Sequence, residues 1–460
     1  MKKFAVASTL TAAMLLTACS GEKPSQVQQE TKTEQNTAVT ENGKTVLKIA
    51  IAGGMPQAFT DNMNMPADIK LERTDYFKEI DDPYQPGSIA AVRRNIEMDM
   101  ISGNAPDMFV LPPAYARIFI DCGITADLFG CMEKYGGIQK NDFLPNMLDG
   151  MTVDGKLPAM VQTVYIKTAI AKTKFVPKEY ENWTPQQAID FYSKAHELGM
   201  SFMGEENGWD TSLLPRYFLT QSASGCIDLT ANTCDFFSGS FISTLDFSAS
   251  HVPPETYNGG DTDTDISGLN DEQLVFPFMI NGFNDALADD TCGALGGEDI
   301  TFVGYPSDDG CGTDVICNGN MIGITSVCSN EEKAWELTDY WMKWQKKLEK
   351  YEHDGTRGVP VLKEPLDRDY HRPDDYGNSI NRVQYRITGS GSIEEYTVPQ
   401  EYKDMLYDYL FRVEFRPYEP EQFMNMVFEE TDPVIAGERS ADDCAAILQD
   451  RISTYLSENN

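Results

Sequence analysis

The chain has 460 residues, which is enough for two domains rather than one compact core. Its net charge of −35 argues against a nucleic-acid partner, because binding phosphates requires a basic surface. Histidines number only four, and the cysteine spacings differ from the C-x2-C pairs that zinc sites favour. We therefore expect no metal centre and no cofactor.

The first 18 residues have the features of a bacterial signal peptide. Lys2 and Lys3 precede an uncharged apolar run, which is shorter than the about 20 residues that a membrane-spanning helix needs. The run ends in Leu-Thr-Ala before Cys19, the pattern of a bacterial lipobox, whose cysteine is diacylated and becomes the mature N-terminus. We predict that Cys19 is a lipid anchor, which would hold the protein on the extracytoplasmic face of the cell membrane.

Residues 19–44 have the composition of a flexible tether. Gln, Thr, Glu, Lys and Ser dominate, and no aromatic residue occurs. Such a segment cannot bury enough apolar surface to offset its ordering entropy. The folded part is therefore expected to begin at Thr45.

The cysteines after Cys19 number nine, ten less the anchor. An exported location permits disulfides, and an odd number leaves at least one thiol unpaired. The pairs close enough in sequence to close small loops are Cys122 with Cys131, Cys226 with Cys234, and Cys311 with Cys317. The spacing leaves the pairing open.

Strand and helix patterns alternate after the tether. Residues 46–51 form an apolar run. A helix is predicted to begin at Ser88, because Ile89, Val92 and Ile96 recur at helical spacing. Residues 108–111 form a second apolar run. Two strands that are apolar throughout, with a helix between them, indicate a parallel sheet covered on both faces. We therefore predict an α/β fold.

Three later helices have clear start signals. Thr184, followed by Pro-Gln-Gln, is a capping box with proline at the first helical position, and Gly199 can end that helix. Ser329, followed by Asn-Glu-Glu, predicts a second start, and Ser440 a third. Trp335 and Trp341 lie on the second of these helices, where core packing is the expected role.

One acidic stretch partly matches a calcium-binding loop. The matching residues, at positions 1, 3, 5 and 12 of the loop, are Asp261, Asp263, Asp265 and Glu272. Ile266 stands at position 6, where the sharp turn requires glycine. A solvated acidic loop is the favoured interpretation.

Several motifs in order resemble the family 1 extracellular solute-binding proteins, the maltose-binding-like lipoproteins that serve ABC importers. The motifs occur at residues 100–107 (MISGNAPD), 154–158 (DGKLP), 301–306 (TFVGYP), 326–341 and 435–443 (IAGERSADD). Each motif is weak alone, but together they span nearly the whole chain after Cys19.

The resemblance implies a two-lobed periplasmic-binding-protein-like fold, in which each lobe is a mainly parallel sheet flanked by helices. Residues 45–160 and 301–368 would form the first lobe, and residues 161–300 and 369–460 the second. A hinge that the chain crosses several times would join them. The implied function is capture of a small solute, most often a sugar, in the cleft between the lobes for delivery to the transmembrane permease subunits. The protein would act as a monomer.

The resemblance also suggests ligand-binding residues. Sugars are held by aromatic faces and by hydrogen bonds from amides and carboxylates. The candidates are Gly54, Met55, Leu111, Tyr115, Gln162, Trp209, Asn281, Phe283, Asn284, Phe423 and Asn425. Core packing is the competing interpretation of Phe283, and an exposed strand residue that of Gln162.

Two other functional classes fit the sequence less well. A lipid-anchored extracellular carbohydrate-active enzyme would use two carboxylates, but 72 acidic residues make any such pair uninformative. The chain contains neither a G-x-S-x-G elbow nor an H-E-x-x-H helix, and we expect no catalytic residue. A surface adhesin would need many evenly spaced short strands, which the predicted helices contradict.

Overall fold

The computed structural model describes residues 39–51, 59, 66–77, 80, 86–203, 213–229, 231–251, 272–283, 286, 299–343, 358–371, 384–387, 393–396, 400–418 and 421–458. All of these belong to one unit, Gln35–Asn460. Within these ranges no helix is both long and apolar enough to cross a membrane. The signal peptide, Cys19 and the acidic stretch 261–271 lie outside the described residues.

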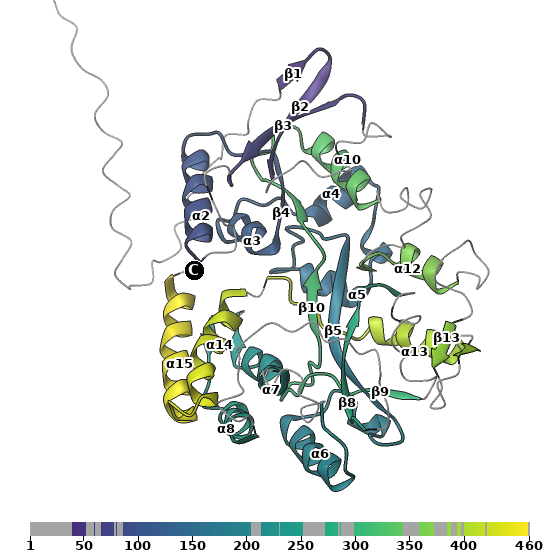
Figure 1. The fold of residues 1–460 in the computed structure, drawn as a ribbon. Helices are drawn as coiled ribbons and strands as arrows, with labels where there is room; N and C mark the ends of the chain where they lie inside the picture. Colours follow the sequence, from purple (N-terminus) through teal and green to yellow (C-terminus); the bar gives the residue numbers. More distant parts are fainter. Residues whose placement is uncertain are drawn as a thin grey trace, which may run out of the picture. The chain divides into compact units, whose positions relative to one another are not determined.

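The first sheet has parallel strands at its centre (Figure 1). Its strands are β1 (Val39–Glu41), β2 (Lys44–Ile51), β3 (Ile69–Asp75), β4 (Met108–Leu111) and β11 (Met321–Ile324). β2 pairs in parallel with β3 and β4, while β1 and β11 pair antiparallel with β2 and β4. The strand–helix–strand prediction is confirmed, because α2 (Pro86–Ile101) connects β3 to β4 and β4 lies beside β2. β1 lies inside the predicted tether 19–44, since Glu41 pairs with Lys44.

The second sheet is organised around one long strand, β5 (Thr163–Lys172). Its partners are β8 (Val275–Ile280), β9 (Ile300–Phe302), β10 (Asp314–Cys317) and β12 (Val359–Pro360). All four partners run antiparallel to β5. The expectation of a mainly parallel sheet is therefore wrong for this one. Two neighbouring strands are parallel when a crossover connection returns the chain to the end of the sheet where the first strand began. Here the chain enters each of the four partner strands from the opposite end, so each runs antiparallel to β5.

Helices carry most of the remaining chain. They are α3 (Pro113–Asp121), α4 (Leu128–Tyr135), α5 (Pro145–Met151), α6 (Pro185–Glu197), α7 (Leu213–Ser224), α8 (Phe241–His251), α10 (Glu331–Met342), α12 (Lys363–Tyr370), α13 (Gln400–Leu410), α14 (Glu421–Ile435) and α15 (Ala441–Glu458). Short 3-10 turns span Lys140–Asp142 and Lys178–Tyr180. There are also two small hairpins among the described residues. One pairs β6 (Ile227–Asp228) with β7 (Thr233–Cys234), and the other pairs β13 (Gln384–Ile387) with β14 (Ile393–Tyr396).

The predicted helix caps are present. The Thr184 hydroxyl accepts from the N–H of Gln187 at 3.3 Å, and the Gln187 side chain accepts from the N–H of Thr184 at 2.8 Å, which completes the capping box of α6. Asn330, one residue after the predicted Ser329, caps α10, and Ser440 accepts from the N–H of Asp443 at the start of α15. Each such cap stabilises the protein by about 1 kcal/mol.

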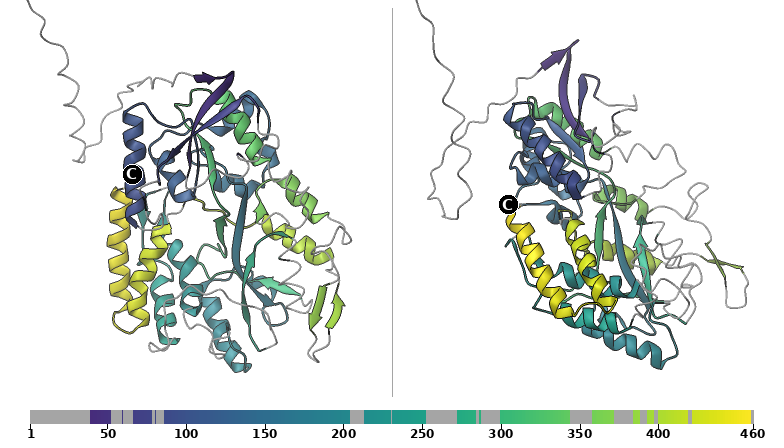
Figure 2. Two further views of the ribbon diagram at one scale, coloured as in Figure 1. Left: turned by 45° about the horizontal axis from the view of Figure 1, so that its top comes forward. Right: turned by 60° about the vertical axis from the view of Figure 1, so that its left-hand side comes forward.

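Two hydrophobic cores organise the described residues. The first core contains β2, β4 and β11 of the first sheet with α3, α4, α5, α10 and α13, and it continues onto the second sheet through Val164, Ile166, Phe276 and Phe302. It includes Trp335 and Trp341, which confirms their predicted packing role. The second core lies among α6, α7, α8, α14 and α15. The last two of these helices run side by side in both views of Figure 2. The exact boundaries of the two predicted lobes stay a prediction.

Three chain segments run together where the first sheet gives way to the second. Met160 and Ile322 exchange both backbone hydrogen bonds, at 2.8 and 2.9 Å. The N–H of Asn318 donates to the carbonyl of Thr163 at 2.9 Å, and that of Val361 to the carbonyl of Gln162 at 3.1 Å. We call residues 159–163, 317–322 and 358–362 the three crossings.

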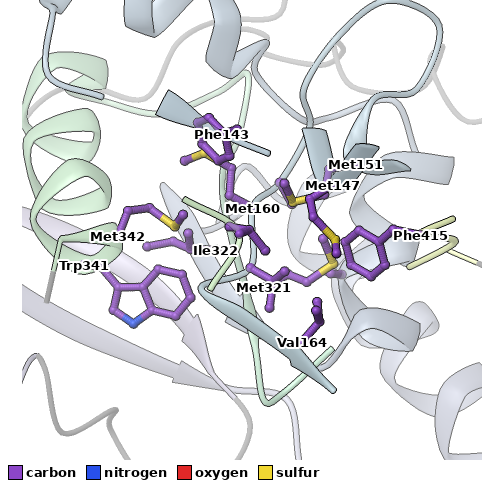
Figure 3. Close-up of a cluster of buried hydrophobic side chains, with 14 of the residues drawn as sticks. Phe143, Met147, Met151, Met160, Val164, Met321, Ile322, Trp341, Met342 and Phe415 are labelled. Carbon is purple, nitrogen blue, oxygen red and sulfur yellow. The ribbon is translucent and has the colours of Figure 1, made fainter. Parts of the chain in front are cut away.

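Methionines pack around the crossings (Figure 3). Met147, Met151, Met160 and Met321 are fully buried, and Met342 is 2% exposed. Phe143, Ile322, Trp341 and Phe415 complete the packing. Methionine side chains are unbranched and adapt to irregular spaces, so this part of the core can repack at low cost.

The eight described cysteines are all thiols. None of the three candidate pairs, Cys122 with Cys131, Cys226 with Cys234 and Cys311 with Cys317, forms a disulfide in the structure. Among the described residues, no group of three or more histidines, cysteines and carboxylates is arranged to hold a metal ion.

Candidate functional site

One face of β5 changes from open to covered along its length. Val164 and Ile166 point to the opposite face and are fully buried in the first core. Tyr165 and Lys167, on the other face, are partly exposed. Strand residues alternate between faces, so the pattern identifies a sheet face that is partly open to solvent at this level.

The neighbouring strands extend this open face on both sides. Across β10, Asp314 pairs with Lys167 and Ile316 pairs with Tyr165, and both partners are partly exposed. Across β8, Met279 pairs with Lys167 and is 37% exposed. Asn281 is exposed and immediately follows the β8 strand. We call these six residues the open strip: Tyr165, Lys167, Met279, Asn281, Asp314 and Ile316.

The same face is covered further along β5. Ala169, Ala171 and Val275 continue its alternation and are fully buried in the second core. α7 is held next to the start of β10, because the side chain of Gln221 donates to the carbonyl of Thr313 at 2.8 Å. The open strip therefore ends where the helices of the second core begin, and the three crossings lie at its other end.

Asp314 and Lys167 carry opposite charges side by side on the open strip, but no hydrogen bond joins them. Neither the carboxylate of Asp314 nor the ammonium of Lys167 has a hydrogen-bond partner among the described residues. Burial raises the pKa of Asp314, and the charge of Lys167 offsets part of that increase. Burial also raises the pKa of Tyr305, which the charge of Asp314 raises further. An ionisable group held in an unfavourable environment is a functional-site candidate.

The chemistry of the open strip suits a polar ligand with an apolar face. The Asp314 carboxylate accepts hydrogen bonds, the Lys167 ammonium donates them, and the Asn281 amide does both. Tyr165 adds an aromatic ring and a hydroxyl, beside the apolar side chain of Ile316. These groups offer hydrogen-bond partners of both kinds next to a surface for stacking.

Four of the predicted ligand-binding residues lie in the cores. Leu111 and Phe423 are fully buried, Phe283 is 1% exposed and Tyr115 is 3% exposed. The Phe283 ring packs edge-on against Tyr370 and Tyr407, which corresponds to the competing interpretation of core packing. These side chains present no open face to a ligand in this structure.

The remaining candidates fall in different places. Asn281 belongs to the open strip. Gln162 lies on the first crossing, where its side-chain amide donates to the carbonyl of Trp341 at the end of α10. Asn425 is exposed on α14. Gly54, Met55, Trp209 and Asn284 lie outside the described residues. Their roles in ligand binding stay predictions.

The sequence interpretation did not identify Tyr165, Lys167 or Asp314. A signal was present for two of them, because polar residues at 163, 165 and 167 alternate with apolar residues at 164 and 166. Asp314 had no such signal. Its place beside Lys167 depends on the pairing of β10 with β5, which joins distant parts of the chain.

No protein-family model matches the sequence, and no curated protein matches it either. Solved structures do match the fold across most of the chain. The sugar-binding protein MalE from Xanthomonas citri is 13% identical, with a TM-score of 0.54, covering 90% of this chain and 98% of its own. A family 1 extracellular solute-binding protein from Alicyclobacillus acidocaldarius is 14% identical, with a TM-score of 0.53, covering 90% of this chain and 99% of its own. The chain therefore has the mixed α/β fold of the family 1 extracellular solute-binding proteins.

Proposed function

We propose that this protein is the solute-binding component of an ABC importer and that it captures a sugar or oligosaccharide. The observation that carries the proposal is the fold, which matches solute-binding proteins over nine tenths of the chain. The open strip supports it, because its amide, carboxylate, ammonium and phenol groups suit the hydroxyls and the apolar face of a sugar ring.

In this proposal the three crossings act as a hinge. Bending at residues 159–163, 317–322 and 358–362 would bring the first sheet and its helices towards the helices of the second core and enclose a ligand on the open strip. Closure is driven by contacts that the ligand makes only in the closed state. The buried methionines beside the crossings would accommodate this movement, because they repack without leaving cavities.

The N-terminal segment would place the protein at its transporter. A lipid on Cys19 would hold the binding protein at the outer face of the cell membrane, and the tether would let it reorient towards the permease subunits. Restricting the protein to the membrane surface raises its effective concentration at the permease. Labelling with a fatty acid, compared between the full chain and Cys19→Ala, tests this part separately.

The direct test is a thermal-unfolding screen of the protein against neutral, acidic and basic oligosaccharides. A ligand that binds only the folded state raises the unfolding temperature, by an amount that grows with its concentration. We expect at least one sugar to produce a saturating shift and to be recovered chemically unchanged. Turnover of that sugar would favour the carbohydrate-active enzyme instead. A shift with amino acids or peptides alone would contradict the sugar assignment.

A further inference from the structure

The charge pair on the open strip narrows the class of ligand. Lys167 and Asp314 occupy directly opposite positions on β5 and β10, on the open face of the sheet. Residues in such register have Cβ atoms about 5 Å apart, so both charged groups can reach one small ligand. This inference about the class of ligand rests on the proposed function, since it concerns the same site.

A structural role alone does not account for the pair. An opposite-charge cross-strand pair contributes only weakly to stability, and these two side chains form no hydrogen bond with each other. Their environment instead disfavours the charged form of Asp314. A carboxylate that is largely removed from water and has no hydrogen bond weakens the fold, so its position beside Lys167 at the edge of the exposed surface points to a use.

We propose that Lys167 and Asp314 make the site selective for a neutral polyhydroxylated ligand, which bridges the two charges with neighbouring hydroxyl groups. One hydroxyl donates to the Asp314 carboxylate, while the next accepts from the Lys167 ammonium. Each hydroxyl can act in either role, so a vicinal diol satisfies both charges.

Charged sugars are rejected by the same arrangement. A uronic acid brings a carboxylate next to Asp314, and an amino sugar brings an ammonium next to Lys167. Either ligand gains attraction from one residue of the pair and meets like-charge repulsion from the other. Discrimination therefore comes from the repulsive partner as much as from the attractive one.

The test uses cellotriose, tri-galacturonic acid and the trisaccharide of glucosamine, with binding measured by calorimetry. Wild-type protein is expected to bind the neutral trisaccharide most tightly. Asp314→Asn and Lys167→Met should each weaken that binding by about 10- to 100-fold, because a hydrogen bond to a charged group is lost. Asp314→Asn should also shift selectivity towards the uronic acid, and Lys167→Met towards the glucosamine trisaccharide.

Matched control variants separate this effect from general damage. Asp246→Asn changes an exposed carboxylate on α8, and Lys178→Met changes a lysine that pairs with Asp299. Both lie off the open strip and should bind cellotriose as the wild type does. A structural defect would lower affinity for all three glycans equally, which contradicts the selectivity shift.

The outcomes distinguish the two proposals. If no sugar of the thermal-unfolding screen binds the wild type, sugar capture and the selectivity of the pair are both wrong. If cellotriose binds but neither variant changes affinity or selectivity, the pair is not the determinant and only this inference is overturned. Tighter wild-type binding of a charged trisaccharide overturns it as well.

Discussion

Gly150 lies directly against the backbone of Phe415: a Cβ placed on Gly150 would be 2.1 Å from the Phe415 carbonyl oxygen. At this close approach, α5 packs directly against the segment that follows α13. Asn146, also on α5, donates from its amide to the carbonyls of Leu410 and Val413 at 3.0 and 2.7 Å. The hydroxyl of Tyr418 completes the attachment by donating to the carbonyl of Met151 at 3.2 Å.

Gly150→Ala is expected to destabilise the protein by about 1–3 kcal/mol, because the methyl group forces the two backbones apart in a packed core. Urea unfolding measures the change. Gly130→Ala is the matched control, since Gly130 also lies in a helix and a Cβ there meets no atom within 4 Å. That control should be neutral or stabilising. Equal destabilisation by both substitutions would show that the approach to Phe415 is unimportant.

Tyr217 links two buried polar groups in the second core. Trp183 donates to the Tyr217 hydroxyl at 2.9 Å, and that hydroxyl donates to the carbonyl of Gly304 at 2.7 Å. Tyr217→Phe should cost about 1–3 kcal/mol, because it leaves the Trp183 N–H without its partner in the core. Thermal and urea unfolding both report the loss. Tyr180→Phe, near the same core, serves as control and should change stability little.

The prediction for Tyr217 can be sharpened by a double-mutant cycle. Trp183→Phe removes the donor, so adding it to Tyr217→Phe should cost less than the sum of the single changes. Fully additive effects would mean that the Trp183–Tyr217 hydrogen bond contributes nothing.

Two aspartates should respond to pH with opposite signs. Burial raises the pKa of Asp314, so its ionised form weakens the fold at neutral pH, and that penalty disappears as pH falls through the raised pKa towards 3.8. Asp314→Asn should therefore increase the free energy of unfolding at pH 7, with a gain that shrinks on acidification. Urea titrations at pH 7 and near pH 4 measure this.

Asp309 provides the opposite case. Burial acts to raise its pKa, but the N–H of Cys311 at 2.9 Å and the guanidinium of Arg416 lower it below the ordinary value. Its stabilising contribution is present above pH 3.8 and is lost as pH falls through the lowered pKa. Asp309→Asn should thus reduce the free energy of unfolding at pH 7. The same direction of change in both variants would refute the assigned environments.

Methionine oxidation tests the packing at the crossings. Met98 on α2 is 62% exposed, whereas Met147, Met151, Met160 and Met321 are fully buried. Mild peroxide treatment followed by peptide mass spectrometry should oxidise Met98 first, because accessibility governs sulfoxide formation. The buried four should react only on the timescale of opening. Oxidation of Met160 as fast as Met98 would contradict a closed core there.

Local features could be predicted well from the sequence. The caps at Thr184 and Ser440 depend on side chains within three residues, and the apolar runs at 46–51 and 108–111 identify buried strands without any knowledge of their partners. The second sheet could not be predicted in the same way. A strand's periodicity gives its faces, but the direction of its neighbours depends on where the chain returns, and β5 receives all four partners antiparallel.

The candidate site shows the same limit. Asn281 follows a recognisable strand and could be selected from the sequence, while Phe283, two residues later, was indistinguishable from it until burial was known. Lys167 and Asp314 become a pair only through the register of β10 on β5. From the sequence alone, an aromatic residue that packs in a core cannot be distinguished from one that faces a ligand, and a polar residue on a strand is easily overlooked as a ligand-binding candidate.

The strand order also has a consequence for how the chain folds. β4, near the N-terminal end, completes its pairing only with β11, which follows the whole of β5 through β10 in the sequence. The first sheet therefore stays unfinished until Ile324 is available, and its closing step must bring together residues far apart along the chain. Such distant pairing slows folding. During synthesis, the first sheet accordingly keeps an open edge at β4 until residue 324 has left the ribosome.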